Sequence, residues 1–263
     1  MKISVLMENT ALNEHFQAEH GLSLLIETEG KKILFDSGAS SAFAQNAEQL
    51  GIRLKAVDCT VLSHGHYDHG GGLHKFLELN ATAPIYMSDK AFGSYYAGED
   101  RYIGLPQDLK SCPQIHFTHE LLKLGPNITL CNCQEQPLHY PLHSYGLHKL
   151  VEGLLSPDDF LHEQYLIIEE KGQRIVFSGC SHRGILNIME WLQPDILIGG
   201  FHFMKLDPQT AEGRQSLDQA AKILNGHNCT YYTCHCTGLE QYAYLKERMP
   251  QLHYLSAGSI LEL

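Results

Sequence analysis

The chain has 263 residues, of which 43% are hydrophobic and 19% charged, the composition of an ordinary globular protein with one large core. Its formal net charge of −11 argues against nucleic acid as a partner, because a phosphate backbone requires a basic face. No apolar run approaches the roughly 18 residues of a membrane-spanning helix, and the N-terminus lacks the features of a signal peptide. We therefore expect a cytoplasmic protein that is a single domain over residues 1–263, without a membrane partner.

The first 80 residues show the patterns of mixed strands and helices. Strands are expected over residues 1–7, 22–27, 32–35 and 57–62. A helix fits residues 40–50 and ends at Gly51, as helix C-termini often do. After Gly70-Gly71-Gly72, apolar residues recur at helical spacing and predict a second helix.

Residues 80–160 have weak periodicity and many Pro, Gly, Tyr and His residues, which indicates a variable insertion of long loops and short strands that faces the substrate. Regular patterns return after it. Strands are expected over residues 165–169, 174–177, 195–198, 230–233 and 260–263 and around Tyr254, and helices over residues 185–192, 209–224 and 239–248. This order predicts an α/β fold in which two mixed β-sheets pack face to face with helices outside. It does not fit a doubly wound nucleotide-binding fold, because no Gly-rich loop follows the first strand.

Eight cysteines in a chain without a signal peptide indicate free thiols and not a disulfide framework. Cys131-Asn132-Cys133 and Cys234-His235-Cys236 have one intervening residue each, whereas structural zinc pairs use two to four. We therefore expect most of these cysteines to be small buried residues.

The strongest chemical signal is a run of four metal-binding side chains within six residues, His64, His66, Asp68 and His69, directly after a predicted buried strand. Three imidazoles and a carboxylate suit zinc, iron or manganese. A tight turn can direct the first two histidines to one side and the last two ligands to the other. One short loop could therefore serve two metal ions.

This run resembles the His-x-His-x-Asp-His signature of the metallo-β-lactamase superfamily, and Phe35-Asp36-Ser37-Gly38 matches the strand-Asp-x-Gly step before it. The resemblance covers nearly the whole chain. It implies an αββα sandwich that binds two divalent metal ions between its sheets, zinc first, with manganese or iron as alternatives. The motifs Glu-His-Gly-Leu-Ser, His-Glu-Gln, Gly-Cys-Ser-His and His-Cys-Thr-Gly resemble the branch often labelled dihydropterin ribofuranosyl-aminobenzene phosphate synthase-like.

The resemblance also implies ligands downstream, where His162 stands at the place of a third histidine and His235 at that of the last one. The two expected ligand sets are His64, His66 and His162 for one ion, and Asp68, His69 and His235 for the other.

The bridging aspartate of the superfamily is missing, because its place is taken by Ser178-Gly179-Cys180-Ser181-His182. Three alternatives follow. Cys180 could bridge as a thiolate, His182 could reach the metals, or one ion could be held loosely. A softer ligand would also change the metal preference.

The predicted function is hydrolysis of a small-molecule substrate, such as a phosphoester or a pterin-linked phosphate, by a metal-bound hydroxide. The expected catalytic residues are Asp68, His182, which would transfer a proton or orient the substrate, and His202, which would face the substrate or support a ligand. A structural role for His202 is an equal alternative, and His20 is a similar candidate. Two other functions stay open: a di-iron redox protein, and a non-catalytic protein that binds or senses metal.

Overall fold

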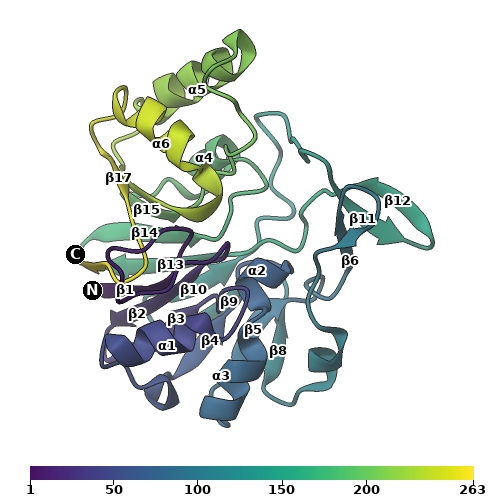
Figure 1. Cartoon of the computed structure of the whole chain (residues 1–263), viewed down its shortest axis with the longest axis vertical. Helices are drawn as coiled ribbons and strands as arrows, with labels where there is room; N and C mark the ends of the chain where they lie inside the picture. The colour runs from purple at the N-terminus through teal and green to yellow at the C-terminus, as the bar shows by residue number, and fades with distance from the viewer.

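The computed structural model describes residues 1–263, with two seven-stranded sheets at its centre (Figure 1). The first sheet has the order β18-β1-β2-β3-β4-β5-β8. It is antiparallel from β18 to β3 and parallel from β3 to β8. Its strands are β1 (Lys2–Met7), β2 (Ser23–Thr28), β3 (Lys31–Phe35), β4 (Cys59–Val61), β5 (Ile85–Ser88), β8 (Ile115–Thr118) and β18 (Ile260–Glu262).

The second sheet has the order β17-β16-β15-β14-β13-β10-β9 and is also mixed. It is antiparallel from β9 to β14 and parallel from β14 to β17. Its strands are β9 (Leu121–Gly125), β10 (Ile128–Cys131), β13 (Tyr165–Glu170), β14 (Gln173–Ser178), β15 (Ile196–Gly199), β16 (Thr230–Thr233) and β17 (Leu252–Tyr254).

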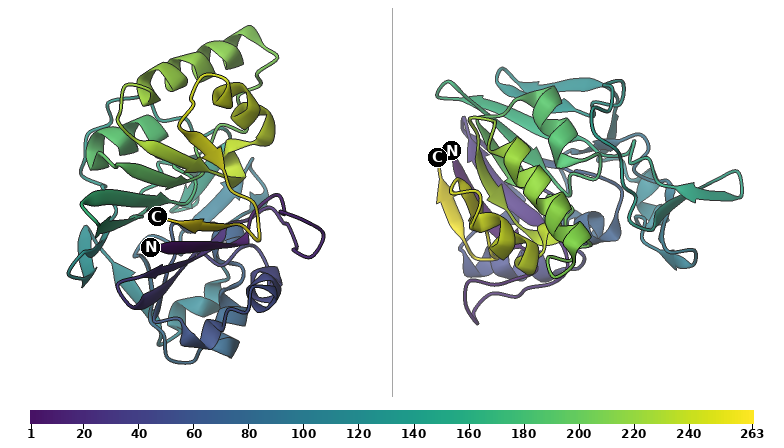
Figure 2. Two further views of the ribbon diagram at one scale, coloured as in Figure 1. Left: turned by 90° about the vertical axis from the view of Figure 1, so that its left-hand side faces the viewer. Right: turned by 90° about the horizontal axis from the view of Figure 1, so that it is seen from above.

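Helices cover the outer face of each sheet (Figure 2). On the first sheet lie α1 (Ala42–Gln49) and α3 (Leu73–Leu79), and on the second lie α4 (Ile185–Leu192), α5 (Ala211–Leu224) and α6 (Leu239–Lys246). The single turn α2 (Tyr67–Gly70) lies within the histidine run. Short 3-10 helices occur at Leu54–Ala56, Gln107–Ser111 and His235–Thr237. None of the helices has the length and apolar character needed to cross a bilayer. The predicted αββα sandwich is thus confirmed.

The sandwich has three apolar layers, because successive side chains of a strand point to opposite faces. In β2, Leu24 and Ile26 pack between the sheets, whereas Leu25 packs against the helices that cover the first sheet. The side chains of the second sheet alternate in the same way: Phe177 of β14 lies between the sheets, and Val176 lies under the outer helices. Strands buried on both faces explain the nearly continuous apolar runs in the sequence.

Residues 80–160 are only partly the insertion that the sequence predicted. β5, β8, β9 and β10 complete the two central sheets. The remaining strands form a third sheet, of order β12-β11-β6-β7, which projects from the sandwich in Figure 1. Its strands are β6 (Ser94–Ala97), β7 (Arg101–Tyr102), β11 (Leu147–Val151) and β12 (Leu154–Pro157). The strands of this region mix polar with apolar residues, as Ile115–Thr118 and Leu147–Val151 do, so the sequence did not separate core strands from projecting ones.

The loops that follow the parallel strands meet at one edge of the sandwich. Those after β3 and β4 carry Asp36 and the histidine run, and those after β14, β15 and β16 carry Cys180 to His182, His202 and His235. Strands that run parallel end at the same edge of a sheet, so these side chains are brought together from distant parts of the chain.

Candidate metal centre

One group of ligand atoms comes from His64, His66 and His182, whose nearest donor atoms lie within 4.8 Å of one another. The Nε2 atoms of His64 and His182 are 3.2 Å apart. All three rings are buried, and burial lowers the pKa of His66 to about 3 and the pKa of the other two well below the ordinary value. Buried neutral imidazoles keep the free electron pair that a metal ion requires.

A second group surrounds the carboxylate of Asp68. Its Oδ2 lies 3.3 Å from Nε2 of His235, 3.3 Å from Nε2 of His20 and 3.8 Å from Nε2 of His69. Burial by itself would raise the pKa of Asp68, but the neighbouring imidazoles outweigh it and hold this pKa well below the ordinary value. An ionised carboxylate facing three imidazoles is a ligand set for a divalent cation.

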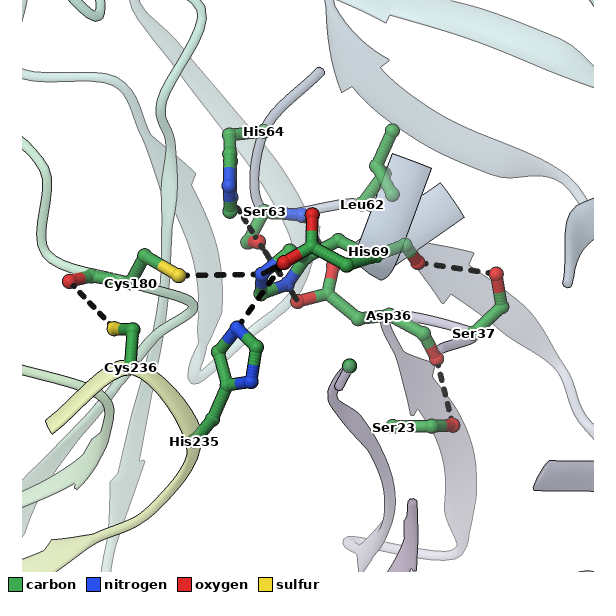
Figure 3. A network of polar contacts seen from close by, with 12 residues as sticks. Ser23, Asp36, Ser37, Leu62, Ser63, His64, His69, Cys180, His235 and Cys236 are labelled. Carbon is green, nitrogen blue, oxygen red and sulfur yellow. Dashed lines mark hydrogen bonds and ion pairs between the residues drawn. The ribbon is translucent and has the colours of Figure 1, made fainter. Parts of the chain in front are cut away.

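Hydrogen bonds from outside the centre orient these rings (Figure 3). Asp36 accepts from Nδ1 of His69 at 2.7 Å and from the hydroxyl of Ser63 at 2.7 Å. The Ser63 oxygen in turn accepts from Nδ1 of His64 at 2.8 Å. In each ring Nδ1 makes the hydrogen bond outside the centre, so Nε2 faces the centre.

His235 is held in the same manner from the N-terminal part of the chain. Its Nδ1 donates to Oδ1 of Asn9 at 2.7 Å, and its backbone N–H donates to Oε1 of Glu8 at 2.6 Å. His235 has a left-handed φ of 49°, a conformation that L-residues rarely adopt. The buried Glu8 carboxylate and the asparagine together hold this backbone and ring in place.

Cys180 lies between the two groups. Its Sγ is 3.2 Å from Nε2 of His69, and it can combine with His64 and His69, with His182 and His202, or with His235 and Cys236 within 4.8 Å. Burial raises the pKa of the Cys180 thiol well above the ordinary value, so a nearby cation would be required to form the thiolate. This position between the two groups is compatible with a bridging thiolate, one of the three alternatives for Cys180 and His182 that the sequence left open.

His162, the expected third histidine, is placed differently. Its Nδ1 accepts from the backbone N–H of Gly65 at 2.9 Å, so its proton sits on Nε2, which lies 3.1 Å from Oδ2 of Asp158. Neither nitrogen is left free for a metal ion. His182, the alternative that the sequence analysis left open, lies beside His64 and His66 in its stead.

His202 lies at the margin of the centre, with its ring centroid 4.2 Å from that of His182. Both of its ring nitrogens are buried without a hydrogen-bond partner. Its φ of 56° is left-handed, which indicates a constrained position and not a mobile surface ring.

A cavity of about 250 Å3, here called the metal-side cavity, opens onto these groups. Among its fourteen lining residues Asp68 is the single carboxylate, and Arg101 and Lys205 are the one arginine and the one lysine. Both cations are exposed and come from the third sheet and from the loop after β15. Neither residue was predicted from the sequence, because no local pattern marks a lone basic side chain that folding brings to a site.

Cys236 is a further residue that the sequence analysis missed as part of the site. It is buried, and its thiol donates to the carbonyl of Cys180 at 3.3 Å. The Cys234-His235-Cys236 spacing is the signal that could have found it, although this spacing does not match structural zinc pairs. In the structure, the Cys236 thiol is grouped with His235 and Cys180.

The residues of the centre fit divalent metal ions. Nine buried side-chain nitrogen or oxygen atoms have no hydrogen-bond partner, and five of them are ring nitrogens of His66, His182, His202 and His235. Such atoms are costly to bury without a partner, and a metal ion bound among them would offset this cost. Nitrogen, carboxylate and thiol donors together suit zinc, iron or manganese.

Comparisons with known proteins agree with this geometry. A family model described as "Metallo-beta-lactamase superfamily" matches residues 17–227. A Methanocaldococcus jannaschii protein named 7,8-dihydropterin-6-methyl-4-(β-D-ribofuranosyl)-aminobenzene-5′-phosphate synthase is 31% identical over 292 positions, which cover 100% of this chain and 96% of that protein. An uncharacterised protein of the same organism is 30% identical over 247 residues, 90% of this chain and 91% of the relative.

Among solved structures, one described as a metal-dependent hydrolase of the β-lactamase superfamily superimposes with a TM-score of 0.82 at 30% identity, covering 100% of this chain and 99% of that one. The similarity therefore extends over the whole chain, as the sequence analysis expected. The chain belongs to the metallo-β-lactamase superfamily.

Proposed function

We propose that this chain is a metal-dependent hydrolase of a small anionic substrate, with a phosphoester as the favoured class. The observation that carries the proposal is the set of five unpartnered, buried imidazole nitrogens that surround one cavity with the Asp68 carboxylate. Bound there, divalent ions would supply Lewis acidity and lower the pKa of a water molecule towards neutrality.

Two sets of side chains would hold these ions. His64, His66 and His182 would bind one of them, and Asp68, His69 and His235 the other. Cys180, between the sets, would take the place of the usual bridging carboxylate.

The chain's own residues would orient the substrate. Arg101 and Lys205 would bind an anionic group at the mouth of the metal-side cavity, because they are the only arginine and lysine that line it. They make this place locally basic in a chain whose net charge is −11. His202 would donate a hydrogen bond from a ring nitrogen to an oxygen of the leaving group.

A group-transfer reaction is the second candidate, since the relative that aligns with the entire chain is named a synthase. Both candidates require the same ligands and the same anion-binding residues. They differ in whether water or a second substrate accepts the transferred group. A di-iron redox function and a non-catalytic role are tested by the same measurements.

The experiment combines metal analysis with a panel of phosphomonoesters and phosphodiesters. We expect about two equivalents of zinc or manganese per chain, hydrolysis of at least one ester, and loss of metal and rate together in His66→Ala and Asp68→Ala. His74→Ala is the matched control, because His74 is exposed and pairs with Asp108 away from the centre.

Full metal content and rate in His66→Ala would refute the proposal. Two equivalents of iron with a visible absorption band would favour redox chemistry. Metal-loaded protein that cleaves no ester in the panel would favour group transfer or a non-catalytic role.

A further inference from the structure

A second cavity of about 250 Å3, here called the aromatic cavity, adjoins the metal centre. Its walls come from the loop before β11, from the loop between β14 and α4 with the start of α4, from the loop after β15 and from α5. Five of its lining residues carry aromatic rings at places outside the centre: Tyr140, His143, Tyr145, Phe201 and Phe203. Its volume lies just below the roughly 300–1,000 Å3 of pockets for drug-sized ligands, so it has room for a single ring system.

The aromatic cavity contains no acidic residue, lysine or arginine. The metal-side cavity, in contrast, contains Arg101, Lys205 and Asp68. The two cavities therefore differ sharply in the chemistry that they can bind: one suits an uncharged planar group and the other an anion next to metal.

Two residues line both cavities, His182 and His202. The ring of Tyr145 lies 5.5 Å from that of His202, centroid to centroid, and His202 lies 4.2 Å from His182. His202, whose two ring nitrogens have no hydrogen-bond partner, therefore lies at the boundary between the two cavities. A single molecule that spans this boundary would contact aromatic rings at one end and the metal centre at the other.

We propose that the aromatic cavity binds a planar aromatic group of the substrate, while a phosphate or similar anion on the same molecule lies between Arg101 and Lys205. Aromatic rings attract one another in offset-stacked and edge-to-face arrangements, which favours a flat ring beside Tyr145 and Phe203. The hydroxyl of Ser216 and the amide of Gln219, both on α5, provide hydrogen bonds for ring heteroatoms. The inference rests on the proposed function, because it defines the substrate of that same centre.

The test compares three probes on the metal-loaded protein by calorimetry. Naphthylmethylphosphonate carries both ring and anion and cannot be hydrolysed at a phosphoester bond. Naphthylmethanol carries the ring alone, and methylphosphonate carries the anion alone. The variants are Tyr145→Ala and Phe203→Ala in the aromatic cavity and Lys205→Ala in the metal-side cavity. Tyr244→Ala on α6 is the control, since Tyr244 stacks on Arg248 and lines neither cavity.

We expect Tyr145→Ala and Phe203→Ala each to raise the Kd of naphthylmethylphosphonate by about five- to tenfold and to leave that of methylphosphonate unchanged. Lys205→Ala should weaken both phosphonates by about tenfold and leave naphthylmethanol unchanged. Tyr145 already has a left-handed φ of 50°, so alanine adds no new backbone strain, and Phe203→Ala provides an independent second variant.

Equal Kd values for the two phosphonates would overturn the inference, and so would a ring probe that is insensitive to both aromatic variants. The proposed function fails separately. Protein that retains no metal and cleaves no ester, yet binds the ring probe through Tyr145, would refute the function and keep the aromatic site. An active metalloenzyme with ring-independent binding would do the opposite.

Discussion

Asp36→Asn would test whether the metal centre depends on a buried carboxylate outside the ligand set. Asp36 is fully buried, and its Oδ1 accepts from the backbone N–H of Ser63 at 2.7 Å. Its Oδ2 accepts from the Ser63 hydroxyl and from Nδ1 of His69, both at 2.7 Å. Burial by itself would lower the pKa of His69, but the Asp36 and Asp68 carboxylates raise it to about 9. The same carboxylates would stabilise the positive charge of a metal ion at Nε2.

Asparagine has the same shape but replaces one accepting oxygen with an amide that donates. Nδ1 of His69 must then accept, which moves the ring proton to Nε2, the atom that faces Cys180 at 3.2 Å. With the carboxylate at Nδ1, loss of one proton from the imidazolium frees Nε2 for metal, whereas with the amide the proton that remains on the neutral ring sits on Nε2. We expect the affinity of the ion at Asp68, His69 and His235 to fall about 10- to 100-fold, equivalent to about 1.4–2.7 kcal/mol. The metal-free protein should lose about 1–3 kcal/mol of unfolding free energy.

The assay is competition for zinc with a chromophoric chelator, which resolves the two equivalents, together with urea unfolding of the metal-free protein. Asp58→Asn is the matched control, because Asp58 is exposed and accepts one backbone hydrogen bond, from Lys32 at 2.7 Å. Wild-type affinity for both equivalents in Asp36→Asn would refute the argument that this carboxylate sets the tautomer of His69.

Three other predictions concern stability and thiol reactivity. Glu163→Ala should lower the free energy of unfolding in urea by about 3 kcal/mol, because the buried carboxylate accepts from two backbone N–H groups and a tyrosine hydroxyl. Glu169→Ala, at an exposed glutamate, is the comparison, and an equal loss of free energy in both variants would contradict the prediction. Gly199→Ala should lower the free energy of unfolding by at least about 3 kcal/mol, because Gly199 has a φ of 146° and a Cβ there would lie 1.6 Å from the carbonyl oxygen of Ser178. Gly172→Ala should lower it by about 1 kcal/mol, because a Cβ at Gly172 would meet no atom within 4 Å. Burial raises the pKa of Cys59 to about 11, so its alkylation at pH 8 should be roughly a hundredfold slower than that of free cysteine. The alkylation rate should increase up to pH 11, and a rate independent of pH would contradict the raised pKa.

The order of the core elements could be predicted because most of their strands are apolar runs buried in the sandwich and their helices repeat apolar residues along one face. Outside residues 80–160, every predicted strand and helix is present, with ends within two residues of those expected. The short strands of the middle region belong to three different sheets, and this assignment depends on pairing partners far away in the sequence. Arg101 enters the metal-side cavity through one of these pairings, between β6 and β7, which explains why the substrate side of the site was not predictable.

The third histidine shows most clearly what a motif leaves undetermined. His162 and His182 both lie near strand ends where a ligand is expected, and nothing in their spacing indicates the direction of the side chains. In the structure, Ser181 turns the chain with a left-handed φ of 56°, and Glu163 accepts the backbone N–H of His182 at 2.8 Å. The Phe160 ring stacks on His182 at 4.5 Å, which fixes the ring against His64. The segment that carries His162 thus supports the loop that carries His182. His162→Ala should therefore leave about two metal ions per chain while His182→Ala should lose one, and the reverse result by elemental analysis would return the ligand role to His162.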